Sequence, residues 1–173
     1  MNSPPIIQVV GYSKSGKTSL ITKLIELLNE KEINVFVIKS ARSHAYEFSS
    51  KDSDRFLESG AQSSAVIFKE YTQTSLKGAT DVVSLVEIMN ELNHFEIVIL
   101  EGFKDLSYPK VLMYADEIPS SDEIDFSTIR YLYSSTEQIK HKSLKHLIKT
   151  NKIALIKSAK ELASRIILDL EKR

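Results

Sequence analysis

Eight residues near the start of the chain have the types and spacing of a loop that binds phosphate. The stretch GYSKSGKT (residues 11–18) holds a glycine, four residues, a second glycine, a lysine and a threonine in that order. Glycines let the backbone fold tightly, so successive N–H groups can point into one concavity that suits a polyphosphate. In such a loop Lys17 reaches the β- and γ-phosphates, and the Thr18 hydroxyl binds Mg²⁺. The pattern therefore predicts a site for a polyphosphate and a magnesium ion.

The sequence around the loop favours a functional site over a chance match in a turn. An apolar run precedes the loop and an amphipathic helical pattern follows it, as in phosphate-loop proteins. We predict the following cofactor-binding residues: Gly11, Ser13, Lys14, Ser15, Gly16, Lys17, Thr18 and Ser19. Lys14 lies three residues after Gly11, so it does not match the variant loop in which a lysine directly after the first glycine reaches across a dimer. An exposed side chain is the alternative role for Lys14.

A glutamate at the end of another apolar run is the candidate magnesium-binding partner of the loop. Glu101 follows four apolar residues and precedes Gly102. Phosphate-loop proteins need an acidic group near magnesium, usually at the end of a neighbouring parallel strand. That end of a sheet is also where open α/β folds bind ligands. We predict that Glu101 is a magnesium ligand and, with Lys17, a catalytic residue. Asp52 and Asp54 are alternatives, although either could instead cap a helix.

Alternating strands and helices must position these residues. Apolar runs predict strands over residues 6–10, 35–38, 63–68, 95–103, 109–115, 128–134 and 152–156. Helical spacing predicts helices over residues 18–31, 51–61, 81–93, 143–150 and 158–172. Residues 69–79 could form a hairpin or a strand with a turn. The order predicts an α/β protein with the three-layer phosphate-loop NTPase fold, a mostly parallel sheet with helices on both faces, in a single domain over residues 1–173.

Composition narrows the function classes. The formal net charge is zero, which argues against bulk binding to nucleic acid. The chain has no cysteine, which excludes disulfides, thiolate zinc sites and iron–sulfur clusters within it. No run of about 18 apolar residues is present, and the first residues do not resemble a signal peptide. We therefore expect a cytoplasmic protein that binds neither nucleic acid nor a membrane.

Two further patterns give no site. Guanine-specific proteins often carry Asn-Lys, any residue and then Asp, but Asn151-Lys152 is followed by Ile153-Ala154, so the residues alone do not choose between GTP and ATP. The four histidines are scattered along the chain, and His141 and His146 lie five residues apart, a poor spacing for a shared metal on a helix.

Three segments together resemble the molybdopterin-guanine dinucleotide biosynthesis protein B family. They are the phosphate loop with its helix, KDSDRFLESGA (residues 51–61) and VILEGFKDLSYPKV (residues 98–111). The resemblance covers about residues 6–115 and implies GTP and Mg²⁺ as cofactors, weak GTP hydrolysis, and frequently a homodimer. It also implies an accessory role beside a separate molybdopterin guanylyltransferase, which attaches GMP to molybdopterin. Carried over by position, Lys17 and Thr18 hold phosphate and magnesium, and Glu101 is the strand-end acid.

The resemblance matches four further positions without assigning them a role, and one segment departs from the family. The matching positions are Lys39, Asp52, Lys104 and Lys110. Where the family tends to show lysine-histidine and then a histidine- and aspartate-containing cluster, this chain has KSARSHAYEF, with Ser40 in place of the first histidine and His44 nearby. Any role of that cluster in hydrolysis or partner contact is therefore open.

Two other functions fit the same loop. One is a small-molecule kinase or ATP-dependent ligase, which would turn over quickly and have an acceptor pocket. The other is a binding module whose loop holds phosphate without hydrolysing it. The sequence offers no identifiable glutamine or arginine finger of the kind that accelerates phosphoryl transfer by roughly 10³ to 10⁵. Slow turnover is therefore the expectation.

Overall fold

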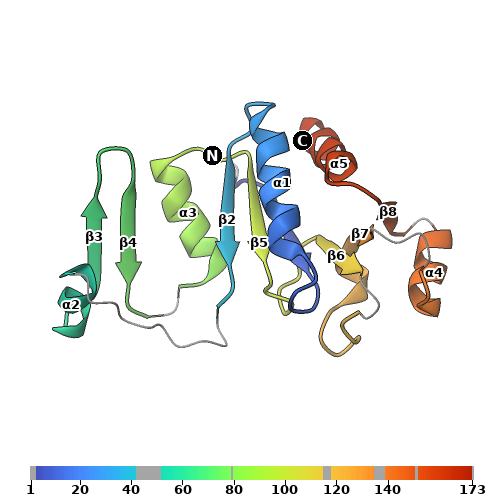
Figure 1. The fold of residues 1–173 in the computed structure, drawn as a ribbon, viewed down its shortest axis with the longest axis horizontal. Helices are drawn as coiled ribbons and strands as arrows, with labels where there is room; N and C mark the ends of the chain where they lie inside the picture. The colour runs from blue at the N-terminus through green and yellow to red at the C-terminus, as the bar shows by residue number, and fades with distance from the viewer. Residues whose placement is uncertain are drawn as a thin grey trace. The chain divides into compact units, whose positions relative to one another are not determined.

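A computed structural model describes residues 3–41, 52–78, 80–114, 118–134, 139–150 and 152–172. The chain divides into two compact units, which are described separately (Figure 1). The first contains residues 1–40 and 86–173, and the second contains residues 41–85. The expectation of a single domain over residues 1–173 stays a prediction.

The first unit is built on a six-stranded sheet in which all neighbouring strands are parallel. The strands, in spatial order, are β2 (Val35–Lys39), β5 (Ile97–Glu101), β1 (Ile6–Val10), β6 (Lys110–Tyr114), β7 (Ile129–Ser134) and β8 (Ala154–Ile156). The central strands β5 and β6 are buried along their whole length. This explains their continuous apolar runs, because helices cover both faces of a parallel sheet. The predicted α/β fold with a mostly parallel sheet is confirmed.

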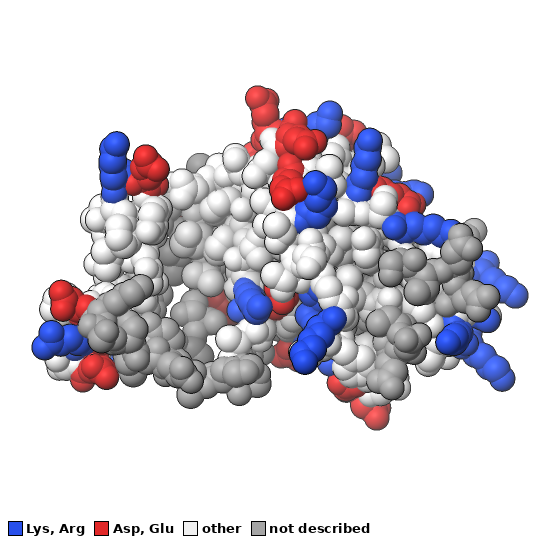
Figure 2. Space-filling model, viewed as in Figure 1, with Lys and Arg blue, Asp and Glu red and all other residues white. Residues whose placement is uncertain are grey.

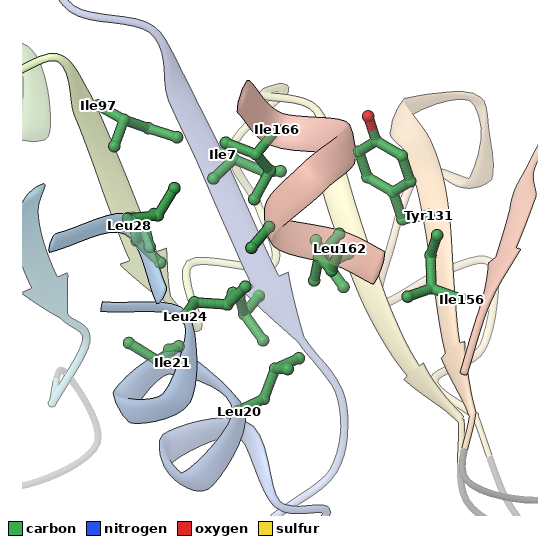
Figure 3. Close-up of a cluster of buried hydrophobic side chains, with 14 of the residues drawn as sticks. Ile7, Leu20, Ile21, Leu24, Leu28, Ile97, Tyr131, Ile156, Leu162 and Ile166 are labelled. Carbon is green, nitrogen blue, oxygen red and sulfur yellow. The ribbon is translucent and has the colours of Figure 1, made fainter. Parts of the chain in front are cut away.

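Helices cover the two faces of this sheet. On one face lie α1 (Lys17–Asn29) and α5 (Ala159–Glu171), which pack against each other and the strands. Figure 3 shows Leu24 and Leu28 of α1 and Leu162 of α5 pointing towards the strand side chains between the two helices. Each fully buried side chain of this size contributes about 1.5–3 kcal/mol.

The opposite face has a second core. Successive strand residues point to opposite faces of a sheet, so Val9 joins the first core and Val10 the second. The second core is covered by α4 (Lys142–Lys149) and by a segment that includes the short 3₁₀ helix η1 (Phe126–Thr128). Leu144 of α4 is fully buried there. The two cores fix the strands whose carboxyl ends carry the predicted site.

The second unit contains α2 (Asp52–Glu58), a two-stranded sheet and the start of α3 (Val82–Leu92), which ends in the first unit. In that sheet β3 (Ser63–Ile67) pairs antiparallel with β4 (Thr72–Leu76). The predicted strand over residues 63–68 is therefore one arm of a hairpin and does not belong to the six-stranded sheet. Gly60, with φ of +112°, follows the end of α2. Ser49 and Ser50, which precede α2 in the sequence and could cap it, lie outside the described residues.

Helix α1 ends two residues earlier than the apolar spacing predicts. The carbonyl of Leu28 accepts hydrogen bonds from the N–H groups of Lys31 and Ile33, and Glu32 adopts φ of +57°. This is a left-handed turn formed without the glycine that usually marks one. Within the described ranges, no helix is both long and apolar enough to cross a lipid bilayer.

Candidate phosphate and magnesium site

The phosphate loop joins β1 to α1, and both of its glycines are required by its geometry. Gly11 has φ of +153°, and a Cβ atom there would lie 2.9 Å from both Met113 Cβ and Ser15 Oγ. Gly16 has φ of +87° and directly precedes the first residue of α1. A side chain at Gly11 would therefore collide with β6 and with the loop itself, and one at Gly16 would be strained.

The Lys17 ammonium group folds back over the loop. It donates hydrogen bonds to the carbonyls of Gly11, at 3.2 Å, and Tyr12, at 2.7 Å. Burial lowers the pKa of Lys17; the nearby Glu101 carboxylate opposes this shift, and the ammonium groups of Lys104 and Lys39 add to it. Neutral carbonyls are weaker acceptors than charged phosphate oxygens, so a phosphate group can displace them.

Two features of the loop suit an anion. Ser15 Oγ is buried and has no hydrogen-bond partner among the described residues. The first turn of α1 has no side-chain cap at Gly16 and no acidic residue. Helix N-termini leave backbone N–H groups unpaired and carry partial positive charge, so this one can accept phosphate oxygens. A buried hydroxyl without a partner is uncommon, and a bound phosphate would supply one for Ser15.

Glu101 lies at the carboxyl end of β5, next to the start of α1. The Thr18 hydroxyl donates to its carboxylate, with Oγ1 lying 3.1 Å from Oε1 and 3.2 Å from Oε2. Strand β5 lies between β1 and β2, and its register with β2 places Lys39 beside Glu101, with Nζ 3.4 Å from Oε1. The carboxylate is nearly buried, whereas the Lys39 side chain is 63% exposed.

The donor set of this cluster fits magnesium. Mg²⁺ prefers oxygen ligands and is usually held by one or two carboxylates, substrate phosphates and water. The Thr18 hydroxyl and the Glu101 carboxylate are the two protein oxygens that the structure brings together here. Within the described ranges, no three histidine, aspartate or glutamate residues gather into a metal site. Thr18 and Glu101 could therefore hold an ion that takes its other ligands from phosphate and water.

The loop after β5 is held by two buried polar residues. Gln8 of β1 donates from Nε2 to the carbonyl of Phe103, at 2.6 Å, and accepts from the N–H of Tyr108, at 3.2 Å. Lys110 is fully buried and donates from Nζ to the carbonyls of Leu106 and Tyr108. Burial lowers the pKa of Lys110. Its ammonium group therefore closes this loop and does not face the phosphate site.

Lys104, which projects from the same loop, connects two neighbouring segments. Its Nζ lies 2.9 Å from Glu123 Oε1 and 5.3 Å from the centre of the Tyr12 ring. The first contact is an ion pair and the second is a cation–π interaction with the phosphate loop. Lys104 thereby connects the loop that follows Glu101 to the loop that contains Lys17.

The structure gathers only part of the predicted set. Lys17, Thr18, Glu101 and Lys39 lie together, the Oγ atom of Ser15 is buried within the loop, and Ser13, Lys14 and Ser19 are exposed. The two alternative acids, Asp52 and Asp54, belong to α2 of the second unit. Asp52 forms an ion pair with Arg55 at 3.6 Å, and Asp54 is buried. His44 lies outside the described residues. The catalytic and binding roles of these residues stay predictions.

The sequence motifs do not point to Gln8, Tyr12 or Glu123, which also shape the site. Gln8 carried a usable signal, because it is the one polar residue in the apolar stretch IIQVV. A polar side chain in a buried strand needs partners. No sequence pattern marks Tyr12 and Glu123, since their contacts depend on the position of Lys104 in the fold.

A hollow of about 800 Å³ opens beside the phosphate loop on the face of the sheet that carries α4. Tyr12 lines it, together with Tyr114 at the end of β6 and Phe126. Lys140, His141 and Ser143 line the part that borders the start of α4. The hollow thus extends from the predicted nucleotide site to α4.

Comparisons with known proteins agree on one family. The model of the family described as molybdopterin guanine dinucleotide synthesis protein B matches residues 6–129. A probable molybdopterin-guanine dinucleotide biosynthesis adapter protein of Bacillus subtilis is 32% identical over 117 residues, which are 65% of this chain and 66% of that protein. The adapter protein of Haemophilus influenzae is 33% identical over 129 residues, 70% of this chain and 72% of that protein.

Solved structures share the fold. The crystal structure of Bacillus subtilis MobB matches with a TM-score of 0.71 and 23% identity, over 96% of this chain and 97% of that one. The MobB homologue of Bacillus stearothermophilus matches with a TM-score of 0.65 and 20% identity, over 97% and 99% of the two chains. The structural match thus extends past residue 129, where the sequence match to the family ends.

Proposed function

The chain belongs to the molybdopterin guanine dinucleotide synthesis protein B family, and on this basis we propose that it is a GTP-binding accessory protein with weak GTPase activity. In this proposal it assists the attachment of GMP to molybdopterin, which forms the guanine dinucleotide cofactor. It acts in the cytoplasm with a molybdopterin guanylyltransferase as partner, and with other molybdopterin-handling proteins as further candidates. We also propose that it works as a homodimer.

The observation that carries the nucleotide part of the proposal is the cluster at the carboxyl ends of β1 and β5. Lys17, Thr18 and Glu101 lie together, with the Thr18 hydroxyl 3.1 Å from the carboxylate. A helix N-terminus and an unpaired buried hydroxyl, that of Ser15, lie in the same loop. Together these groups supply cation, carboxylate and backbone donors for a triphosphate with magnesium.

The chain's own groups exchange partners when such a ligand binds. Lys17 leaves the two loop carbonyls and donates to phosphate oxygens, which are stronger acceptors. Thr18 and Glu101 would hold the magnesium ion through their hydroxyl and carboxylate oxygens. Lys39, which already lies beside Glu101, adds a positive charge near the phosphates to those of Lys17 and the magnesium ion. The ion, when bound, neutralises part of the phosphate charge.

Slow hydrolysis follows from what surrounds the cluster. In the described part of the chain, no arginine forms a hydrogen bond or ion pair with Thr18 or Glu101; Arg130, for example, pairs with Asp169 at 3.1 Å. Fast phosphoryl transfer relies on such a group to stabilise the transition state. This chain therefore suits binding with slow turnover.

A binding titration tests the proposal. Calorimetry with GTP and with ATP, each in the presence of Mg²⁺, is run on the wild-type protein, on Lys17→Ala and on Lys23→Ala. Lys23 is a matched control because it lies on the same helix and pairs only with Glu26 at the surface. Loss of a hydrogen bond to a charged group costs about 1.5–3 kcal/mol, so Lys17→Ala should weaken GTP binding by about 10- to 100-fold.

The same titration can contradict the proposal in two ways. If the wild-type protein binds neither nucleotide, the phosphate-loop assignment fails. If ATP binds clearly tighter than GTP, the base is wrong and a small-molecule kinase or ATP-dependent ligase becomes the better account. The Lys23→Ala protein should match the wild type in each case.

A further inference from the structure

Positive charge is concentrated in one stretch of this electrically neutral chain. Residues 139–160 contain seven lysines, two histidines and no aspartate or glutamate. Residues 1–138 contain 13 lysines and arginines against 20 aspartates and glutamates. The stretch lies beyond residue 129, where the match to the family model ends. Its charge is therefore not part of the sequence pattern that places the chain in its family.

The densest part of this charge is a row of side chains along α4, here called the α4 row: Lys142, Lys145, His146 and Lys149. With 3.6 residues per turn, these four positions share one side of the helix. All four are exposed, and none forms a side-chain hydrogen bond or ion pair with another described residue. In Figure 2, blue side chains gather at the right-hand end of the first unit, where Figure 1 places α4.

Part of the α4 row works against the stability of its own helix, although His146 and Lys149 lie in the last turn, where positive charge suits the helix dipole. Like charges three and four residues apart repel each other, and Lys142 places a positive charge at the positive N-terminal end of the helix dipole. Elsewhere in the chain exposed lysines such as Lys14 and Lys31 stand singly, or are paired, as Lys23 is with Glu26 on α1. A row of neighbouring like charges is better explained by an anionic surface that binds it.

Three features select the class of anionic partner. Residues 139–160 contain no arginine, so the planar guanidinium that forks onto phosphate is missing. They contain no phenylalanine, tyrosine or tryptophan, so stacking on nucleic acid bases is absent as well. The apolar side of α4 is already used, because Leu144 is fully buried and Leu147 and Ile148 pack on the second core. The helix thus keeps no apolar face for insertion into a lipid surface.

The start of α4, where the row begins, borders a hollow beside the predicted nucleotide site. The hollow that begins at Tyr12 of the phosphate loop ends at Lys140, His141 and Ser143, at the start of α4. A protein docked along α4 would therefore border this hollow and reach the edge of the phosphate loop. Such a position suits an accessory protein that works beside another enzyme on one nucleotide.

We propose that the α4 row is the docking surface for an acidic face of the molybdopterin guanylyltransferase. The identity of this partner rests on the proposed function, whereas the surface and its chemistry rest on the charges of α4. Lysine rows of this kind mainly accelerate association and set orientation, and their effect weakens as salt is added.

The test uses the full chain and the guanylyltransferase of the same organism. Association is followed by biolayer interferometry at low and high salt, for the wild type and for the triple variant Lys142→Glu, Lys145→Glu and Lys149→Glu. The matched control is Lys31→Glu, Lys69→Glu and Lys172→Glu, which changes the net charge equally at three other exposed lysines. Circular dichroism and GTP titration accompany each protein.

We expect the α4 variant to associate at least about tenfold more slowly at low salt, because electrostatic steering changes association rates by about 10 to 10³. The control should stay within about threefold of the wild type, since its charges lie off the docking surface. Both variants should bind GTP as the wild type does, because none of the six lysines contacts the phosphate loop.

Other outcomes overturn the inference and remain distinguishable from failure of the proposed function. Equal association of the α4 variant and the wild type would reject the α4 row while the GTP-binding account stands. Absence of transferase binding by the wild type, with GTP binding intact, would reject both the row and the partner. Binding of the wild type, but not the α4 variant, to an RNA oligonucleotide or to phosphatidylserine vesicles, with transferase binding unaffected, would reassign the row to that ligand.

Discussion

The phosphate loop and α4 differ in whether their positive charges have partners within the chain. Three cations that border the predicted site already have partners in the chain, although Lys14 of the loop is exposed: Lys17 has two backbone carbonyls, Lys39 has Glu101, and Lys104 has Glu123. Along α4 three exposed lysines have no described partner. The loop is thus arranged before its ligand arrives and needs only an exchange of partners. The surface of α4, by contrast, presents charge that no described side chain pairs, so it is open to a partner molecule.

The largest expected effect comes from breaking the shape of the loop. In Gly11→Ala, the added Cβ would lie 2.9 Å from Met113 Cβ and from Ser15 Oγ, at a φ that favours glycine. Overpacking of this kind costs about 1–3 kcal/mol, and the backbone strain adds about 1–2 kcal/mol. We expect a loss of about 3 kcal/mol in the free energy of unfolding by urea, and no measurable GTP binding.

Gly60→Ala is the matched control for this variant. Gly60 also has a left-handed φ, of +112°, but nothing lies within 4 Å of an added Cβ. Its cost should be limited to backbone strain, about 1 kcal/mol, and its GTP binding should equal that of the wild type. Equal destabilisation in the two variants would show that the contact with β6 is not what demands glycine at position 11.

A smaller effect is expected from Lys110→Met, which removes the ammonium group that closes the loop after Glu101. The carbonyls of Leu106 and Tyr108 lose their donor, but the burial cost that lowers the Lys110 pKa disappears as well. Global stability should therefore change by less than about 1.5 kcal/mol, while the amides of residues 102–108 exchange faster with deuterium and GTP binds several-fold more weakly.

Gln8→Leu checks the same account by an independent route. It removes the two hydrogen bonds from β1 to the loop and should also speed amide exchange there. Unchanged exchange over residues 102–108 in both variants would show that neither side chain holds the loop.

The smallest effect should come from Lys39→Gln. Its ion pair with Glu101 involves a lysine side chain that is 63% exposed, so stability should change by less than about 0.5 kcal/mol. GTP affinity should fall by only about three- to fivefold, because one of several cations near the phosphates is lost, and the difference should shrink at high salt. A GTP affinity equal to that of the wild type at low salt would remove Lys39 from the site.

The sequence predicted the parts of the site that depend on local pattern. The glycine spacing of the loop, the strand before it and the helix after it are visible in residues 6–29, because turn chemistry and helical periodicity are local. Glu101 was identified as a strand-end acid, and the structure places it beside Thr18 because β5 pairs directly with β1. That pairing depends on strand order, which periodicity does not encode.

The sequence did not predict the role of Lys110 or the pairing of β3, because both depend on contacts between separate segments of the chain. Lys110 matched a motif position, and a lysine is almost never fully buried unless it has partners. Its partners are backbone carbonyls of a loop whose path no side-chain pattern describes. Residues 63–67 have a strand-like composition, but pairing with residues 72–76 separates them from the six-stranded sheet.

The most direct test of the central claim, that Thr18 and Glu101 complete a magnesium–triphosphate site, is the magnesium dependence of GTP binding in Glu101→Gln. Calorimetry is run on wild type and variant, with Mg²⁺ and with chelator. We predict that Mg²⁺ tightens GTP binding by the wild type at least about tenfold and binding by the variant less than about twofold, with similar affinities in chelator, because the amide removes the charge that holds the ion. An equal magnesium effect in both proteins would contradict the site.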